Sequence, residues 1–310
     1  MNEALMQLSH TPVDKVTIAG FDVFVKRDDQ LHPAFSGNKA RKFAYFLAQP
    51  FTQVNKLVGY GSPQANSLYS MAALAKMRGW QLDFYVDHIA EQILKQPAGN
   101  YAAAIAHGAN VIDLSQQDDR NDLSTRGYIE RHVAGDDTVL YVPEGGRCEY
   151  AEYGLFQLAR EIVDWKQQQQ LSQLNVFLPS GTGTTALFLT RSFAQLDESI
   201  KVLTCAVVGG DDYLTSQFYE LSSDCNDHPQ IITPPKRYHF GKLYREFYQH
   251  WLELNQSGIE FELLYDPLGW MMCKQYLQQS SDEPMLYLHQ GGLLGNETML
   301  PRYKRKFDGN

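Results

Sequence analysis

The sequence lacks several features that would assign it to other classes of protein. Its four cysteines are scattered and form no CxxC pair, which favours free thiols in a reducing cytoplasm over a disulfide framework. No apolar run is long enough to span a membrane. The first residues, Met1 to Ala4, lack the charged and apolar regions of a signal peptide. We therefore expect a cytoplasmic protein with no membrane partner.

Positive charge and metal-binding patterns are also scarce. The chain has 27 Lys and Arg against 36 Asp and Glu, a net charge of −9, so a nucleic-acid partner is not expected. The short basic run Arg302 to Lys306 is interpreted as a solvated tail. The nine histidines show no HxxxH or HxH spacing, which predicts no metal site, and no Gly-x-Ser-x-Gly elbow of a hydrolase is present.

What is present is an alternation of strand and helix patterns. The chain has 310 residues, 44% hydrophobic and 20% charged, which suits one large globular domain or two lobes. Strands are predicted at 21–26, 56–60, 83–86, 111–112, 139–142, 175–178 and 202–208. Helices are predicted to follow Lys39 and to span about 67–78, 101–107 and 154–163, with buried helix packing in 238–251. The alternation predicts an α/β fold with mostly parallel sheets and helices on both faces.

A lysine stands in a chemically suggestive position near the N-terminus. In Ser36-Gly37-Asn38-Lys39, Ser36 can cap a helix, and Gly37 permits close approach of the backbone. Lys39 then lies at the edge of the core, where partial desolvation would lower its pKa. It is a candidate for imine formation or proton transfer. The alternative is the basic first turn of an ordinary surface helix.

A second motif, Pro179 to Thr185, follows a strand and precedes a helical run. Its glycines, hydroxyls and helix N-terminus are the elements of an anion site, although a plain strand-to-helix turn is the alternative. Gly181-x-Gly183-x-x-Ala186 formally matches a dinucleotide fingerprint, but the acidic residue expected at the end of the next strand is missing. The loop has no lysine, so it is not a nucleoside-triphosphate loop.

Taken together, the two motifs make the chain resemble the 1-aminocyclopropane-1-carboxylate deaminase and D-cysteine desulfhydrase family. These are pyridoxal-phosphate enzymes of fold type II, the fold of the tryptophan synthase β subunit. The resemblance runs from about residue 9 to residue 300. It is carried by segments 25–29, 36–42, 64–66, 143–146, 180–185, 265–267 and 289–292.

The resemblance implies roles for individual residues. Lys39 would hold the cofactor covalently and act as the proton-transfer base, and Asn38 would shape the pocket. Asn66 would hydrogen-bond the ring oxygen of the cofactor, unless it only caps the helix that begins at Ser67. The phosphate would be bound by the loop residues Ser180, Gly181, Thr182, Gly183, Thr184 and Thr185. Asp266-Pro267 could be only a turn.

The chain departs from the family pattern at two places. Where the family has a serine that contacts the substrate carboxylate, this chain has Ala65, between Gln64 and Asn66. Gln64, with Ser62 or Ser67 as nearby sources of a hydroxyl, is predicted to bind substrate.

The second departure follows Asp266-Pro267, where the family tends to place a tyrosine and then an acidic or hydroxyl residue. This chain has Gly269, which cannot stack, and Trp270, which can stack on the cofactor or substrate but only donates a hydrogen bond. Gln290 is then the candidate partner of the ring nitrogen.

We therefore expect a two-lobed protein that binds pyridoxal 5′-phosphate between a large lobe, residues 1–41 and 154–310, and a small lobe, residues 42–153. By resemblance it would be a homodimer. The favoured function is a lyase or deaminase, with hydrolase as a broader label, acting on a small amino acid by β-elimination of the D-cysteine desulfhydrase type. Two alternatives are 1-aminocyclopropane-1-carboxylate deaminase and a cofactor-binding protein with a degenerate catalytic site. A nicotinamide-dependent oxidoreductase is disfavoured by the missing acid.

Overall fold

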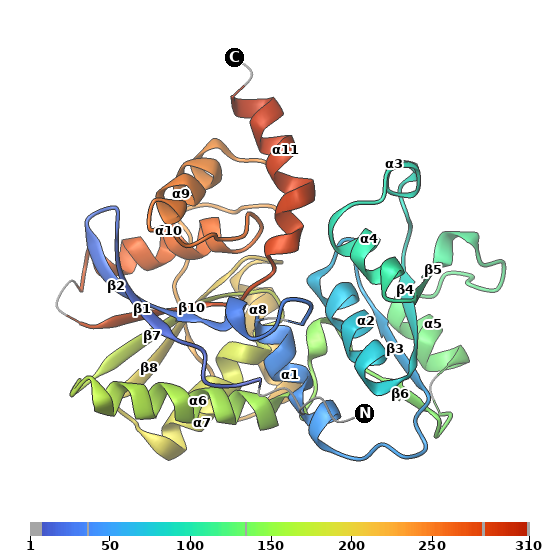
Figure 1. Cartoon of the computed structure of the whole chain (residues 1–310), viewed down its shortest axis with the longest axis horizontal. Coiled ribbons are helices and arrows are strands. Elements are labelled where there is room, and N and C mark those ends of the chain that lie inside the picture. The colour runs from blue at the N-terminus through green and yellow to red at the C-terminus, as the bar shows by residue number, and fades with distance from the viewer. Residues whose placement is uncertain (1–7, 36, 134, 281–282, 309–310) are drawn as a thin grey trace.

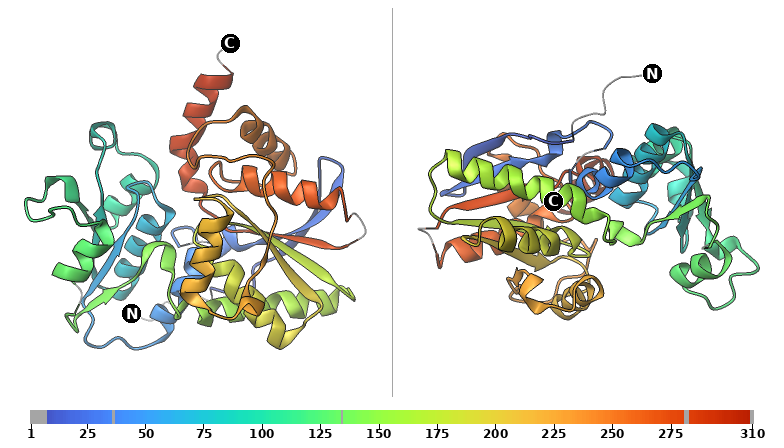
Figure 2. Two further views of the ribbon diagram at one scale, coloured as in Figure 1. Left: turned by 180° about the vertical axis from the view of Figure 1, so that it is seen from behind. Right: turned by 90° about the horizontal axis from the view of Figure 1, so that it is seen from below.

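Two sheets lie side by side, each with helices on both faces (Figure 1, Figure 2). The computed structural model describes residues 8–35, 37–133, 135–280 and 283–308. The larger sheet has six strands in the order β1-β2-β10-β7-β8-β9, and the smaller has four in the order β5-β4-β3-β6. The cap expected from Ser36 and the start of the chain through residue 7 lie outside the described residues.

The larger sheet is parallel except for the antiparallel pair β1/β2. All seven residues of β7 are buried, as expected for a central strand covered on both faces. One face packs on α6 and α7, and the other on α9, α10 and α11. The strands are β1 Val13–Ile18, β2 Phe21–Arg27, β7 Leu174–Ser180, β8 Ile200–Ala206, β9 Gln230–Ile231 and β10 Met285–His289. The helices of this part are α6 Ala151–Gln168, α7 Thr184–Leu196, α8 Asp211–Leu221, α9 Arg245–Asn255, α10 Asp266–Leu277 and α11 Asn296–Phe307.

The smaller sheet is entirely parallel. Its core is shared with α2 and α4 on one face and with α5 on the other. The strands are β3 Lys56–Tyr60, β4 Gln81–Val86, β5 Ala109–Asp113 and β6 Val139–Tyr141. The helices are α2 Asn66–Arg78, α3 Glu91–Lys95, α4 Gly99–Ala106 and α5 Thr125–His132.

This architecture confirms the predicted α/β class, with corrections in detail. The basic run Arg302 to Lys306 is not a tail: it belongs to α11, where Tyr303 is buried. All four cysteines are free, as predicted. Among the described residues, no helix combines the length and apolarity needed to cross a membrane. The division into lobes at 41/42 and 153/154 stays a prediction, although the four strands of the smaller sheet do come from the middle of the chain.

Helix α1, Gly37–Ala48, connects the two halves of the core. Its Phe43 and Phe46 pack in one cluster with Leu57 and Leu68, which belong to the smaller sheet and its helix α2. Its other side packs against α6 so closely that a Cβ added at Gly154 would collide with the backbone carbonyl of Arg41. The helix that carries the candidate lysine is therefore fixed from both sides.

A buried ion network anchors α1 to the larger sheet. Arg41 is 0% exposed, and its guanidinium uses all five of its donors: two bonds to Asp28 at 2.8 and 2.9 Å, two to Glu161 at 2.6 and 2.9 Å, and one to the carbonyl of Leu8 at 3.1 Å. Lys26 completes the network with a 2.8 Å bond to Glu161. Two positive and two negative charges balance, so the cost of burying each is offset by its partners.

The network generates a stability prediction. Arg41→Ala would leave the buried carboxylates of Asp28 and Glu161 short of partners, and we expect a loss of about 3–5 kcal/mol in the free energy of unfolding, measured by urea titration. Arg126→Ala is the control, because Arg126 pairs with Glu130 at 2.7 Å on the surface and should cost less than about 1 kcal/mol. Equal losses in the two variants would contradict the assigned role of the network.

Candidate functional site

The sequence motifs converge because each follows the carboxyl end of a parallel strand. The segments 61–66, 143–146, 181–183 and 290–292 follow β3, β6, β7 and β10 in turn. In open α/β sheets the carboxyl ends of the strands are where ligands bind. The lysine helix α1 enters the same region, beside the end of β10.

Lys39 lies in the first turn of α1 and is partly buried. The turn before it is packed against β10: the Asn38 N–H donates to the Gln290 carbonyl at 3.1 Å, and a Cβ at Gly37 would collide with that same carbonyl. Gly37 has φ +68°, a left-handed conformation that glycine adopts without strain. The Lys39 amine itself donates to Asn38 Oδ1 at 3.4 Å.

The pKa of Lys39 is lowered to about 8, mainly because burial disfavours the charged form, and the carboxylate of Glu144 opposes this shift. The direction is the one expected from the sequence. A lysine with this pKa has an appreciable neutral fraction near pH 7, and the neutral amine is the form that acts as nucleophile or base.

A short turn from the smaller sheet closes over the lysine helix. The 3-10 helix η3, Glu144–Gly146, follows β6, and Lys42 on α1 donates to the carbonyl of Gly145 at 3.0 Å. Gly145 has φ +71°, and a Cβ there would lie 2.9 Å from the methyl group of Thr182. This turn therefore joins α1 of the core to the loop after β7. Burial and the neighbouring charge of Lys39 hold the pKa of Lys42 well below its ordinary value.

The loop after β7 has the geometry of an anion site. Gly183 precedes α7 at φ +68°, and a Cβ there would collide with Phe218. The backbone N–H groups of the first turn of α7 are therefore open toward the loop, where a helix carries partial positive charge. Thr185 Oγ1 is buried and has no hydrogen-bond partner among the described residues, while Thr182 and Thr184 pair their hydroxyls at 3.1 Å.

Ser180 differs from the other residues predicted for this loop. It is the last residue of β7, and its hydroxyl accepts a 2.7 Å hydrogen bond from Thr204 on β8. Its side chain is thus engaged between two strands, whereas the residues from Gly181 to Thr185 form the loop and the start of α7.

Asn66 begins α2 and does not cap it. The residue before the helix is Ala65, and Asn66 Oδ1 instead accepts a 2.8 Å bond from Asn100 Nδ2 on α4. Asn100 also donates to the Gln64 carbonyl at 3.0 Å and is 2% exposed. Because its oxygen is occupied, the Asn66 amide has its N–H₂ group left to donate. This nitrogen lies close to Gly292, since a Cβ added to that glycine would be 2.6 Å from it.

The side chain of Gln64, predicted to bind substrate, has partners within the protein. Its Nε2 donates to the Ala98 carbonyl at 3.3 Å, and its Oε1 accepts from the Tyr101 N–H at 3.4 Å. These bonds hold the start of α4 in place. The other two predicted substrate residues of this segment remain near it: Ser62 accepts from the Gln64 N–H at 3.3 Å, and Ser67 is buried in the first turn of α2.

Gln290 links the lysine turn to the end of β7, directly before the loop. Its Oε1 accepts from Asn38 Nδ2 at 2.9 Å, and its Nε2 donates to the Pro179 carbonyl at 2.7 Å. Both ends of the amide are therefore occupied. A contact of Gln290 with a cofactor nitrogen stays a prediction, but the bridge between Asn38 and Pro179 is present in the structure.

The departures at Gly269 and Trp270 have a packing explanation. Asp266-Pro267 is not an isolated turn but the start of α10, where buried Asp266 accepts a 2.9 Å bond from Tyr287 on β10. A Cβ at Gly269 would lie 2.6 Å from that Tyr287 hydroxyl, so a tyrosine cannot stand there. Trp270 is 0% exposed in the core and donates to Glu253 at 3.3 Å. The structure does not bring it to the other candidate residues.

Three residues join the site that the sequence did not assign. Tyr265 lies against Gly181, 3.3 Å from the position of an added Cβ, and its ring is 5.3 Å from that of Phe240. Glu144 interacts electrostatically with Lys39, and Asn100 orients Asn66. Tyr265 and Glu144 lie inside motifs that were recognised, whereas no local signal marks Asn100, which is 34 residues from its partner.

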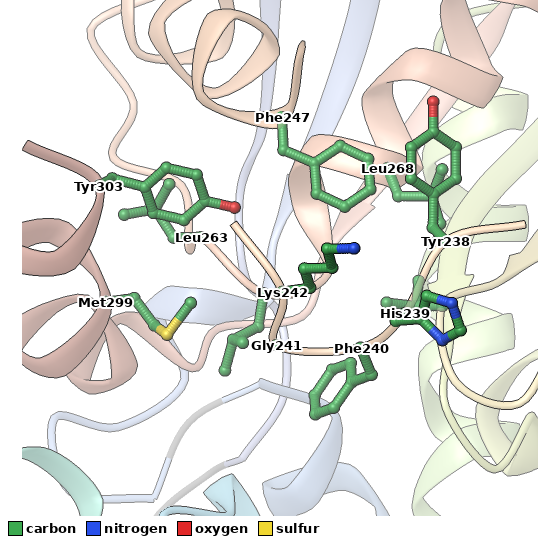
Figure 3. A pocket seen from close by; sticks show the side chains of 12 residues that line it. Tyr238, His239, Phe240, Gly241, Lys242, Phe247, Leu263, Leu268, Met299 and Tyr303 are labelled. Atoms are coloured by element: carbon green, nitrogen blue, oxygen red, sulfur yellow. The ribbon is translucent and has the colours of Figure 1, made fainter. Parts of the chain in front are cut away.

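Phe240 is among the residues that line a small pocket adjoining this region (Figure 3). It is lined by Tyr238, Met299 and Tyr303 among others, and Phe240 lies on the side opposite Phe247. Its volume is about 10 Å³, comparable to the space needed for one water, so it is too small for a substrate. Within the part of the chain that the structure describes, no three His, Cys, Asp or Glu side chains are grouped to hold a metal ion.

The lowered pKa of Lys39 predicts a pH-dependent stability. Between pH 8 and 10.5 the unfolded chain binds more protons at Lys39 than the folded protein does. The contribution of Lys39 to the free energy of unfolding therefore rises with pH over this range. Lys39→Met should therefore raise the free energy of unfolding at pH 7 by roughly 1–3 kcal/mol, with the gain fading as pH rises from 8 to 10.5.

Urea titrations at several pH values, performed on the protein without added small molecules, measure this. Lys76→Met at an exposed position of α2 is the control and should show no such pH-dependent gain. A Lys39→Met variant that behaves like this control would contradict the environment described for Lys39.

Comparison with known proteins adds an independent finding. Residues 6–243 match the family described as pyridoxal-phosphate dependent enzymes. The chain is 24% identical over 213 residues to a putative 1-aminocyclopropane-1-carboxylate deaminase of Thermotoga maritima, covering 67% of this chain and 66% of that protein. It is 29% identical over 201 residues to the D-cysteine desulfhydrase of Serratia proteamaculans, covering 61% and 59%. These matches thus span less than two thirds of either relative.

The fold is shared over a longer stretch. A crystal structure described as an ACC deaminase homologue superposes with a TM-score of 0.78 at 20% identity, covering 97% of this chain and 95% of that one. At this identity the likeness establishes the fold alone. None of these three proteins is described as a hydrolase, so that label finds no support among them.

The residues present fit the family's cofactor. The Thr185 hydroxyl, which has no hydrogen-bond partner in the described part of the chain, and the glycine before α7 suit a phosphate, and Lys39 supplies a partly buried amine with a lowered pKa. This chain belongs to the family of pyridoxal-phosphate dependent enzymes, with fold type II architecture.

Proposed function

We propose that the protein catalyses β-elimination from a small amino acid, releasing a keto acid and ammonia. The observation that carries the proposal is the bridge through the Gln290 side chain. It accepts a 2.9 Å bond from Asn38, beside Lys39, and donates a 2.7 Å bond to the carbonyl of Pro179, at the end of β7 just before the phosphate loop. The amine and the anion site thereby have a set separation, as a cofactor bound at both ends requires.

Specific residues would hold the cofactor. Lys39 would bind its aldehyde carbon, the Asn66 amide would donate to its ring oxygen, and Gly181 to Thr185 would hold its phosphate. Tyr265, whose ring borders Gly181, would form one wall. When bound to an amino acid, pyridoxal phosphate supplies an electron sink for the charge left at the α carbon.

The protein's own groups then account for the proton transfer. With a substrate bound, Lys39 would be the base that removes the α proton, and its buried surroundings, which lower its pKa to about 8, would favour the neutral amine that this role needs. The substrate carboxylate would meet the N-terminus of α2, at Asn66 and Ser67, where the helix offers N–H donors and partial positive charge. The leaving group would depart from the β carbon with the electron pair of its bond, and one water molecule would complete the release of keto acid and ammonia.

Two other functions stay in view for stated reasons. A relative bears the name putative 1-aminocyclopropane-1-carboxylate deaminase, which would make ring opening the reaction. Ala65 and Gly269 remove a hydroxyl and an aromatic ring that the family tends to use, which favours a cofactor-binding protein without turnover. A homodimer and a cytoplasmic location also stay predictions.

An absorbance spectrum distinguishes these functions. Protein loaded with pyridoxal phosphate should show a visible band that Lys39→Ala removes, because only a primary amine forms the exchangeable link. A panel of D- and L-amino acids with β leaving groups should shift the band and yield keto acid and ammonia. Release from 1-aminocyclopropane-1-carboxylate alone would assign the ring-opening reaction, and a band that no amino acid disturbs would support the binding protein. Absence of any band would refute the proposal.

The hydrogen bond from Asn100 predicts coupling in cofactor binding. Asn66→Ala and Asn100→Ala should each weaken pyridoxal-phosphate binding by about tenfold, while the double variant should be no weaker than Asn66→Ala alone, because Asn100 acts through Asn66. Cofactor dissociation constants from titration measure this. Asn110→Ala, which removes a 2.8 Å surface bond to Asp83, should leave binding unchanged. Additive losses would show that Asn100 does not act by orienting Asn66.

A further inference from the structure

One carboxylate at the site has no assigned role. Glu144 is exposed and makes no hydrogen bond or ion pair with any residue that the structure describes. Its interactions with Lys39 and Arg147 are electrostatic only, and it does not belong to the residues that would hold the cofactor.

The position of Glu144 is nonetheless fixed by its neighbours. The next residue, Gly145, is held by the 3.0 Å bond from Lys42 and by its contact with Thr182, and Gly146 packs on Phe43. The turn is therefore clamped between α1 and the phosphate loop. Its carboxylate reaches the start of the 61–66 segment, with Oε1 3.7 Å from the position of a Cβ at Gly61.

The charged and titratable groups around Glu144 come from four elements. Lys39 faces it from α1, Arg147 from its own turn, Tyr213 from α8, and Tyr265 from the segment before α10. Arg147 is already paired with Glu220 at 2.9 Å, and the amine of Lys39 is the group that would bind the cofactor. With both cations engaged, Glu144 presents negative charge to whatever lies beside Gly61.

The 61–66 segment thus has two unlike ends. Its far end leads into the N-terminus of α2, which favours an anion and suits the α-carboxylate of an amino acid. Its near end, at Gly61, lies beside the carboxylate of Glu144. A substrate held by its amine and its α-carboxylate has two remaining substituents, the α hydrogen that Lys39 would remove and the side chain, and the side chain is the one left to direct toward Glu144.

We propose that Glu144 selects the substrate by its side chain, favouring amino acids whose side chain carries a hydrogen-bond donor or a positive charge. A carboxylate accepts hydrogen bonds and cannot donate them, so hydroxyl, amide or amine groups are matched to it. Acidic side chains are rejected by like charge. This inference rests on the proposed function, because it presumes an amino acid bound at the cofactor.

The test compares asparagine with aspartate, which have nearly the same shape and differ in charge. Dissociation constants for both, as D and L forms, are measured on the holoenzyme from the shift of the cofactor absorbance. Wild type should bind asparagine more tightly than aspartate by about tenfold or more. Glu144→Gln should bring the ratio close to one, and Glu144→Arg should invert it. Glu149→Gln, at an exposed acid three residues after that turn, should keep the wild-type ratio.

The outcomes separate the inference from the function on which it rests. Equal binding of asparagine and aspartate by wild type would overturn the inference, as would a preference that survives in Glu144→Gln. The ratio of the asparagine and aspartate dissociation constants of the wild type needs no variant, so it tests the inference even if a variant fails to fold. A holoenzyme whose spectrum responds to no amino acid would refute the proposed function itself, and with it the role of Glu144.

Discussion

The structure depends on the buried guanidinium of Arg41. A charge inside a protein is tolerated only when its donors and its charge are both satisfied, and here all five donors find acceptors from three parts of the chain. Burial alone would raise the pKa of Glu161, but its bonds with Arg41 and Lys26 lower it overall, so the acid stays charged. This network fixes α1 relative to β2 and α6. Lys39, two residues before Arg41, therefore has a defined position at the end of the sheet.

Helix α1 also explains how the two sheets share one site. Its buried guanidinium faces the larger sheet, while Phe43 and Phe46 pack in the core of the smaller one. The turn Glu144–Gly146 reaches back from the smaller sheet to touch both α1 and Thr182. The turn after β6, the loop after β7 and the segment after β10 are thus held by direct contacts near the amine of Lys39. Glycine at 37, 145 and 183 is required for these close approaches, because a Cβ at each would crowd or collide with a neighbour.

Packing accounts for the departure from the family pattern at Gly269. At Gly269 the space of a side chain is taken by Tyr287, whose hydroxyl is bound to Asp266, and Tyr265 contributes an aromatic ring beside Gly181 instead. The region has therefore been rearranged rather than emptied of aromatic side chains. Ala65 has no such replacement, and the nearby hydroxyls of Ser62 and Ser67 are the available substitutes.

The sequence by itself determined the α/β class and the positions of the lysine and of the glycine-rich loop after β7, because strand periodicity, glycine and helix-start signals are local properties of the chain. It also identified the family through short motifs of fixed residue type. Tertiary structure alone decided that the oxygen of the Asn66 side-chain amide is occupied and its N–H₂ group is left to donate. It also decided that the side chains of Gln64 and Ser180 are hydrogen-bonded within the protein and that Trp270 is in the core. The partners of Asn66, Gln64 and Ser180 lie 24 to 37 residues away in the sequence, such as Thr204 for Ser180 and Asn100 for Asn66. No local pattern encodes such contacts, because they exist only once separate strands and helices have packed together.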